Sequence, residues 1–253
     1  MSWSGVRSSQ GIRCILDPLG ENANSRGQAE KSVKAYRSCI KAIHSSGLNS
    51  SVSVKLTAIG ALHDKEQCLK NALDLLKEAS ASRIGFEIDM EGAPLVDFTI
   101  KTAIACAEVQ GPITLAIQAY LDRTNADLEG LLGTGIRIRL VKGAYLGDVT
   151  VFWRVQDRFK RLFDVLLKAG APFCVGTHDI DLLEEMKQKA DGDRDLVEFG
   201  FLMGLADSTK VEMAGDGWRV AEYVPFGDSR VAYEARRVRY LRELEEMGLK
   251  PAP

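Results

Sequence analysis

GIRIRLVKGAYLGD, at residues 135–148, is the stretch from which the fold of this chain is first predicted. Apolar residues at 136, 138 and 140 alternate with Arg137 and Arg139, and this two-residue period indicates a strand. Lys142, Gly143 and Ala144 follow in a loop, where glycine lets a ligand approach bare backbone. Two cations beside backbone amides suit an anionic ligand such as phosphate. Solvated cations at a strand end would give the same pattern, so this stretch by itself favours neither interpretation.

The composition is that of an ordinary globular chain. Its 253 residues are 45% hydrophobic and 27% charged, enough to bury one large α/β core or two small ones. Lys and Arg number 33 against 35 Asp and Glu, for a formal net charge of −2. A nearly neutral chain has no bulk attraction for nucleic acid or for an anionic membrane, so any basic site must be local.

The cysteines and the N-terminal residues indicate a cytoplasmic protein. Five cysteines are widely spaced without a CxxC pair, which argues against a disulfide framework and against a zinc site, and we predict that no metal is bound. We expect them to be small buried residues in a reducing compartment. The first ten residues, MSWSGVRSSQ, contain no apolar targeting segment, and no run of the chain is long enough to span a bilayer.

Short strand-like runs alternate with longer amphipathic runs, which is typical of parallel α/β architecture. Eight predicted strands cover residues 12–17, 51–56, 84–89, 113–120, 136–141, 173–178, 197–202 and 220–225. Eight predicted helices cover residues 29–45, 65–79, 94–109, 125–132, 151–168, 180–189, 208–214 and 229–247. We therefore predict a (βα)8 TIM-like barrel. A doubly wound open sheet is the alternative, but no GxGxxG follows the first strand.

In a (βα)8 barrel, functional residues lie where the strands end, on the carboxyl-terminal face. Polar or ionisable residues stand near the end of each predicted strand: Asp17, Glu21, Lys55, Asp89, Glu91, Gln118, Arg139, Lys142, Thr177, His178, Glu198 and Tyr223. So many ionisable groups at one opening need partners when they are desolvated, and we interpret them as a site. No repeat or linker divides the chain, so we expect a single domain over residues 1–253.

Four residues of the last predicted helix share one polar face. Tyr233, Arg236, Arg237 and Tyr240 are spaced at i, i+3, i+4 and i+7. Arginine binds carboxylates through two parallel hydrogen bonds, so a substrate carboxylate held by both arginines is one hypothesis. A solvated basic face that continues through positions 239 and 242 is the other.

The motifs at successive strand ends resemble those of the proline dehydrogenase family, flavin-dependent (βα)8 barrels that also form the first catalytic domain of bifunctional proline-utilisation proteins. The resemblance runs from about residue 11 to about residue 237. It rests on DPLGE at 17–21, VSVKLT at 52–57, EIDME at 87–91, IQAY at 117–120, RLVKGAY at 139–145, GTHD at 176–179, YVPFG at 223–227 and YEARR at 233–237. No single motif is decisive, but their order and placement make the combined pattern specific.

The resemblance implies an FAD cofactor at the barrel opening. Its isoalloxazine ring would lie near Asp89, Met90, Gln118 and Arg139. Its ribityl-pyrophosphate and adenosine would be held by Lys142, Gly143, Ala144, Thr177 and His178. The residues agree with this, because a cationic Arg139 favours the electron-rich reduced ring and the Lys142 loop is already a phosphate candidate.

The resemblance also implies L-proline as the substrate, with Asp89 and Arg139 as catalytic residues. Its carboxylate would bind Arg236, Arg237 and Lys55, its ring would pack against Leu202, Tyr223 and Tyr233, and Glu21 would pair with an arginine. The substrate amine loses its proton, hydride passes from C5 to flavin N5, and the product is Δ1-pyrroline-5-carboxylate. A quinone would reoxidise the flavin, which implies transient contact with the inner face of the membrane.

Three other functions stay open. The substrate could be a related cyclic imino acid such as hydroxyproline. A flavin-independent Schiff-base lyase could use Lys55 or Lys142, because a lysine in a dry pocket can have a lowered pKa. A non-catalytic barrel would serve as a subunit or binding module.

Three features depart from the family pattern. Gly200 in VEFGFL stands where glutamine is usual, and Tyr240 stands where a glutamate often follows the paired arginines. The chain also begins almost at the first predicted strand. We therefore expect a short version without the usual preceding helices, whose barrel bottom is uncovered or sealed by a partner.

Overall fold

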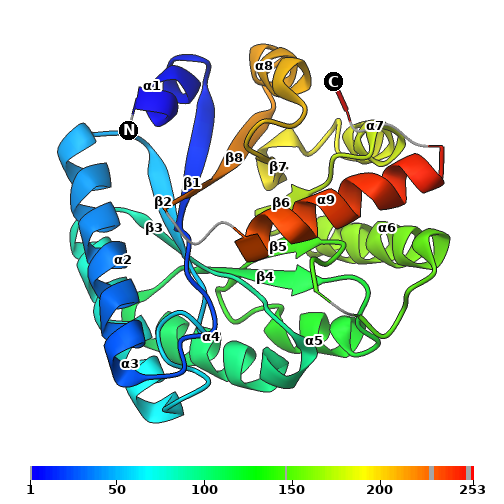
Figure 1. The fold of residues 1–253 in the computed structure, drawn as a ribbon. Coiled ribbons are helices and arrows are strands. Elements are labelled where there is room, and N and C mark those ends of the chain that lie inside the picture. The colour runs from blue at the N-terminus through cyan, green and yellow to red at the C-terminus, as the bar shows by residue number, and fades with distance from the viewer. Residues whose placement is uncertain (1, 146, 228–230, 249–251) are drawn as a thin grey trace.

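A computed structural model describes residues 2–145, 147–227, 231–248 and 252–253. Within these residues, eight parallel strands close into a barrel in the order of the sequence, and β1 completes it by pairing with β8 (Figure 1). The strands are β1 (Ile12–Pro18), β2 (Ser50–Val54), β3 (Gly85–Ile88), β4 (Thr114–Gln118), β5 (Arg137–Val141), β6 (Phe173–Gly176), β7 (Val197–Leu202) and β8 (Arg219–Phe226). The predicted (βα)8 TIM-like barrel is confirmed.

Helices follow the strands much as the amphipathic runs predicted. They are α2 (Arg26–Ser46), α3 (Lys65–Ala81), α4 (Val96–Gln110), α5 (Thr124–Leu131), α6 (Phe152–Ala169), α7 (Ile180–Lys189), α8 (Asp207–Gly215) and α9 (Val231–Glu246), with short 3-10 helices at Ala93–Leu95 and Arg194–Leu196. The predicted last helix includes residues 229 and 230, which lie outside the described residues. The other boundaries shift by a few residues, as helix ends commonly do.

Local sequence explains where several helices begin and end. Ser25 and Asp64 accept hydrogen bonds from the backbone N–H groups of Gln28 and Gln67, which caps the first turns of α2 and α3. Helix α2 ends at Gly47, whose φ of 64° is readily adopted only by glycine. These caps fix where the chain turns back toward the next strand.

A helix that was not predicted, α1 (Ser2–Ser9), precedes β1. Nε1 of Trp3 donates to Glu222 at 3.0 Å, and Arg7 pairs with both Glu222 and Asp207. Glu222 alternates along β8 with Tyr223, which points into the barrel, so α1 packs on the outside of the wall. No pattern in the sequence indicated this helix, because it is too short and polar for a periodic signal and tertiary contacts hold it in place.

The lower part of the barrel interior is filled with charged side chains. Arg13 donates to Glu198 at 2.9 and 2.7 Å and to Glu87 at 3.1 Å, and Arg137 lies 3.2 Å from Glu198. Burial alone would raise the pKa of Glu198, but the two arginines hold it below its ordinary value. Glu198 is the second residue of β7, so its predicted place at the strand end is wrong. These ion pairs thus occupy the barrel interior near the amino-terminal ends of the strands.

Helix α9 lies across the mouth, the end of the barrel where the strands' carboxyl termini meet (Figure 1). Arg236 contacts Glu21 after β1, Arg239 donates to the carbonyl of Ala144 after β5 at 2.7 Å, and Arg237 donates to the carbonyl of Gly204 after β7 at 3.0 Å. A helix in this place has a polar inner face because it covers strand ends rather than the apolar outer wall.

Candidate active site at the barrel mouth

A cavity of about 250 Å³ opens at the mouth beneath α9. Apart from Glu21, every residue predicted to bind the cofactor or the substrate lines this cavity: Lys55, Asp89, Met90, Gln118, Arg139, Lys142, Gly143, Ala144, Thr177, His178, Leu202, Tyr223, Tyr233, Arg236 and Arg237. Glu21 reaches it indirectly, through its ion pair with Arg236. The structure thus brings the residues predicted for the cofactor and the substrate to one place. Of the other polar residues assigned to strand ends, Asp17 and Glu91 lie outside the lining and Glu198 lies near the other end of the barrel.

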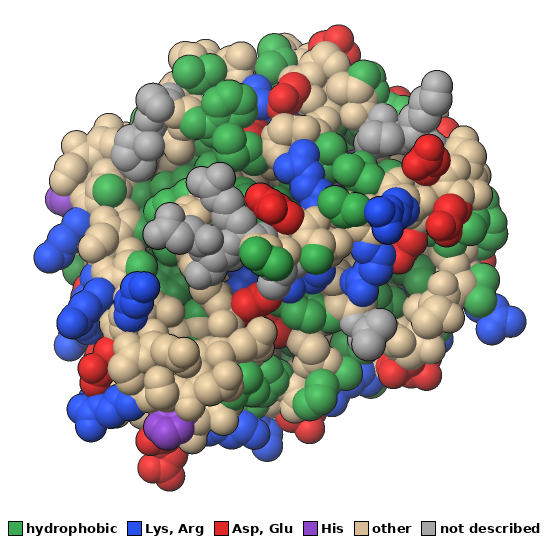
Figure 2. All heavy atoms as spheres, viewed as in Figure 1, with side chains coloured by type: hydrophobic (Ala, Val, Ile, Leu, Met, Phe, Trp, Pro, Cys, Tyr) green, Lys and Arg blue, Asp and Glu red, His purple; other side chains and the backbone are tan. Residues whose placement is uncertain are grey.

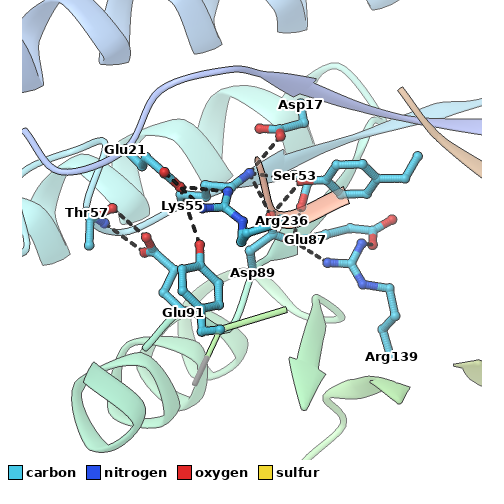
Figure 3. Close-up of polar contacts among 12 residues, drawn as sticks. Asp17, Glu21, Ser53, Lys55, Thr57, Glu87, Asp89, Glu91, Arg139 and Arg236 are labelled. Carbon is cyan, nitrogen blue, oxygen red and sulfur yellow. Dashed lines mark hydrogen bonds and ion pairs between the residues drawn. The ribbon is translucent and has the colours of Figure 1, made fainter. Parts of the chain in front are cut away.

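Lys55 lies at the centre of this group and is only 5% exposed (Figure 3). Its Nζ lies 2.6 Å from Oδ2 of Asp17, 3.0 Å from Oδ2 of Asp89 and 3.0 Å from Oη of Tyr223. Burial alone would lower the pKa of Lys55, but Asp17, Tyr223 and Asp89 raise it well above its ordinary value. Lys55 is therefore an ammonium at neutral pH, with one oxygen for each of its three hydrogens.

Arg139, at the middle of β5, connects this group to the charged interior below. Its Nη1 lies 2.8 Å from Oε2 of Glu87, and its Nη2 donates to Oδ1 of Asp89. Asp89 also accepts from Oγ of Ser53 at 2.7 Å and from Oη of Tyr223 at 2.6 Å. Burial alone would raise the pKa of Asp89, but Lys55 and Arg139 hold it well below its ordinary value. Asp89 is thus a fixed anion that orients the two cations.

Gln118 and Tyr120 hold the loop that follows β5. Nε2 of Gln118 donates to the carbonyl of Glu91 at 2.9 Å, and its Oε1 accepts from Oη of Tyr120 at 2.7 Å, which in turn accepts from the N–H of Tyr145 at 2.9 Å. A Cβ on Gly143, whose φ is 135°, would lie 1.7 Å from Cε1 of Tyr120. The glycine that the sequence analysis linked to ligand approach is therefore required by the packing of Tyr120.

The proposed phosphate-binding side of the cavity contains a lysine and a neutral histidine. Nζ of Lys142 lies 3.2 Å from Asp179, and burial lowers its pKa even though Asp179 opposes this shift. Nε2 of His178 accepts from the N–H of Leu202 at 2.8 Å, so Nδ1 carries the hydrogen. Burial, aided by nearby cations, lowers the pKa of His178 to about 3. The imidazole is therefore uncharged at neutral pH.

The paired arginines of α9 have different partners. Arg236 forms a two-point ion pair with Glu21, with distances of 3.0 and 2.9 Å, and its guanidinium lies 4.8 Å from the ring centroid of Tyr145. Arg237 donates to the Gly204 carbonyl. The face that carries them lines the cavity, so the hypothesis of a purely solvated basic face is not what the structure shows.

Two carboxylates that pair with cations of the site were not predicted from the sequence. Glu87 precedes Asp89 by two residues, so strand period alone places both on the inner face of the barrel, a signal that was available. Asp179 caps α7 by accepting from the N–H of Leu182 at 3.2 Å. Asp179 and Lys142 are far apart in the sequence, so no local sequence pattern predicts their contact.

Gly200, one of the departures from the family pattern, pairs in register with Gly176 of β6. Both glycines line the cavity, and the nearest atom to a Cβ on Gly200 would be the carbonyl oxygen of Val175 at 3.7 Å. Gly200 therefore leaves room at the cavity wall, whereas a Cβ on Gly176 would lie only 3.2 Å from Cγ1 of Val141.

The surface around α9 carries no large area of one charge. Figure 2 shows basic and acidic side chains interspersed where α9 lies in Figure 1. No helix of the described ranges has the length and apolar character needed to cross a membrane. Within those ranges, no three His, Cys, Asp or Glu side chains gather as a metal site would require.

Comparisons with known proteins agree on one family. The family model described as proline dehydrogenase matches residues 4–246. Proline dehydrogenase 1 of Bacillus subtilis strain 168 is 31% identical over 235 residues, which cover 90% of this chain and 78% of that protein. Proline dehydrogenase of Deinococcus radiodurans is 31% identical over 240 residues, which cover 90% and 77%.

Solved structures show the same fold within longer chains. Proline utilization A (PutA) of Bdellovibrio bacteriovorus, inactivated by N-propargylglycine, superposes with a TM-score of 0.86 at 18% identity, over 95% of this chain and 31% of that one. A Bradyrhizobium japonicum PutA mutant gives a TM-score of 0.81 at 23% identity, over 90% and 28%. The chain thus spans under a third of these proteins but more than three quarters of the curated relatives.

Proposed function

The chain belongs to the proline dehydrogenase family, and from this premise we propose that it oxidises L-proline to Δ1-pyrroline-5-carboxylate with FAD bound at the barrel mouth, as a single domain over residues 1–253. The observation that carries the proposal is the mouth cavity. There two arginines of α9 face a buried cluster of Lys55, Asp89 and Arg139.

The donors around the cavity fit a flavin dinucleotide. Lys142 and the backbone at 143–144 suit the pyrophosphate, and Thr177 together with the Nδ1–H of neutral His178 suits the ribityl and adenosine hydroxyls. Met90 and Gln118 would border the ring beside Arg139, whose charge favours the reduced form. When bound, FAD supplies the hydride acceptor for C5 of the substrate.

The remaining lining residues would orient the substrate. An incoming carboxylate suits Arg236 and Arg237, and it would share Arg236 with Glu21. Lys55 adds positive charge from below, while Asp89 fixes Lys55 and Arg139 in place. Leu202, Tyr223 and Tyr233 would pack against the ring and exclude water. Such orientation brings the reacting carbon into place before the chemical step.

The alternatives have less support. A Schiff-base nucleophile must be an uncharged amine, whereas Lys55 is held as an ammonium by two carboxylates. Lys142 has a lowered pKa but is paired with Asp179. Hydroxyproline remains a candidate substrate, because the missing side chain at Gly200 leaves room at the cavity wall. A quinone acceptor and contact with the inner face of the membrane rest on the family resemblance.

Spectroscopy of the purified protein tests the proposal. We expect an oxidised-flavin spectrum that bleaches anaerobically on addition of L-proline, and a product that reacts with o-aminobenzaldehyde. Pyrrolidine, which lacks the carboxylate, is the control and should bleach the flavin poorly. A flavin-free preparation that cannot be reconstituted with FAD, or a bound flavin that L-proline leaves oxidised, would refute the proposed reaction.

A further inference from the structure

Asp17 is a buried carboxylate at the end of β1 to which the proposed reaction has so far given no task. It is 0% exposed and lies beside Lys55, with Oδ2 at 2.6 Å from Nζ (Figure 3). Its Oδ1 is buried and accepts no hydrogen bond from any residue that the structure describes. Tyr223 lies close by, but it donates its single hydroxyl hydrogen to Asp89. A buried carboxylate oxygen without a donor is costly unless the group can take up a proton.

The proposed reaction needs a destination for one proton, and this inference rests on that reaction. The amine of an amino acid is an ammonium at neutral pH, and its lone pair becomes available only after the proton leaves. Asp89 is poorly suited to receive it, because Lys55 and Arg139 stabilise its charged form. Lys55 is itself already protonated.

We propose that Asp17 receives, through Lys55, the proton that the substrate amine must lose. The N–H bond of Lys55 that points at Asp17 breaks, an O–H bond forms on Asp17, and Lys55 becomes a neutral amine. Rotation about its Cε–Nζ bond turns the lone pair to the side of Tyr223, which lines the cavity together with Lys55. There the substrate ammonium takes the place of the Tyr223 hydroxyl at Nζ and gives its proton to Lys55. The net change is one N–H bond lost by the substrate and one O–H bond gained by Asp17, with no electron transferred.

The surroundings of Asp17 favour this transfer. Burial raises its pKa above the ordinary value, and Asp89 adds to the shift, although Lys55 opposes it. The titratable groups that face it are Lys55 after β2, Asp89 after β3, Tyr36 and Cys39 of α2, Tyr223 of β8 and Tyr233 of α9. An amino acid carries its amine and carboxylate on one carbon, so a lysine near the carboxylate also reaches the amine. Asp17 acts only through Lys55 and does not touch the substrate.

The test compares Asp17→Asn, which keeps the shape but cannot take up a proton, with Asp17→Glu, which keeps a carboxyl group. Stopped-flow bleaching of the flavin by L-proline is measured anaerobically from about pH 6 to about pH 10. We expect Asp17→Asn to be slower by about 100-fold or more at neutral pH. Its rate should recover by about tenfold per pH unit as the substrate amine deprotonates in solution. Asp17→Glu should keep the shape of the wild-type pH profile.

Glu222→Gln is the matched control, since Glu222 is an equally buried carboxylate paired with cations outside the barrel wall. It should lower the melting temperature without changing the pH profile. The proposal would be overturned if Asp17→Asn lowered the bleaching rate by the same factor at all pH values. It would also be overturned if the pH profile of Asp17→Glu matched that of Asp17→Asn. If L-proline bleaches the wild type and Asp17→Asn alike, only the proton role fails; if it bleaches neither, the proposed reaction itself fails.

A second measurement does not depend on turnover. Infrared titration of the flavin-free protein should show the carbonyl band of a protonated carboxyl group at pH values above the ordinary aspartate range, and Asp17→Asn should remove it. If the spectra of the wild type and of Asp17→Asn show the same carbonyl bands at these pH values, the proposal is overturned as well.

Discussion

Replacing Arg139 with Met tests how much the buried ion pairs below the mouth contribute to the free energy of unfolding. The guanidinium is almost fully buried and contacts two carboxylates, those of Glu87 and Asp89. Removing one partner of a buried ion pair typically costs about 3–5 kcal/mol, because the remaining charge is left desolvated. Glu87 retains Arg13 at 3.1 Å and Asp89 retains Lys55 at 3.0 Å, so we expect a loss near 3 kcal/mol rather than 5.

The stability lost in Arg139→Met should depend on pH, and the contacts of Asp89 predict in which direction. In the wild type the pKa of Asp89 is depressed, so its contribution to stability is present above the unfolded pKa and disappears as the pH falls through the folded value. Without Arg139, burial pushes the pKa of Asp89 upward, and protonation of Asp89 at low pH relieves the cost. The difference between wild type and Arg139→Met should therefore be largest at neutral pH and shrink below about pH 5.

Urea unfolding of the flavin-free protein at several pH values measures this difference. Arg139→Lys keeps one charge and should lose less. Arg123→Met removes an exposed ion pair with Asp97 and Asp127 and should cost no more than about 1 kcal/mol at any pH. A loss in Arg139→Met below 1 kcal/mol at neutral pH, or one that does not change with pH, would refute the reasoning. In the loaded enzyme the same substitution should also weaken flavin binding and slow its reduction by L-proline.

Three further predictions concern the rim of the cavity. Ala144→Val should yield largely flavin-free protein, and stoichiometric flavin in this variant would contradict the proposed position of the cofactor. Gly143→Ala should in addition perturb folding, because the new Cβ at position 143 would lie 1.7 Å from Tyr120. Flavin content and melting temperature are measured for both variants. Arg236→Met and Arg237→Met should each weaken the apparent affinity for L-proline and for tetrahydrofuroic acid by about 1.5–3 kcal/mol with flavin retained, and unchanged inhibition would remove the carboxylate role. His178 should stay neutral until about pH 3, so the free energy of unfolding falls as the pH drops below the unfolded pKa of about 6.5; an NMR titration of its ring that shows protonation near neutral pH would contradict this.

The fold was predictable because its signals are local and periodic. Eight alternations of strand and helix patterns leave few topologies other than a closed parallel barrel. Helix α1 was missed, since eight mostly polar residues form a helix only through contacts such as that of Trp3 with Glu222. The position of α9 was also out of reach, because amphipathic pattern shows which face is polar but not whether that face meets solvent or a cavity.

The site was predictable to the extent that strand ends share a mouth. Lys55 and Asp89 directly follow β2 and β3, Arg139 lies two residues before the end of β5, and the barrel geometry brings them together. Their partners were harder to predict, because which acid meets which base depends on register and side-chain length. Glu198 shows the limit: its strand was placed correctly, but its position near the start of that strand puts it at the opposite end of the barrel.

The ion pairs in the barrel interior also limit which amino-acid substitutions this protein can accept during evolution. A single neutral replacement of Arg13 leaves Glu198 with Arg137 alone. A neutral replacement of Glu198 leaves Arg13 with Glu87 alone and removes the carboxylate that Arg137 contacts. Replacing all members of a buried ion pair or triad with apolar residues of similar volume is often neutral or stabilising by about 1–4 kcal/mol. The bottom of the barrel is therefore free to change only when Arg13, Arg137 and Glu198 change together, whereas any change among Lys55, Asp89 and Arg139 also alters the proposed chemistry at the mouth. An engineer seeking a more robust variant should start with those three bottom residues, where added stability need not come at the expense of turnover.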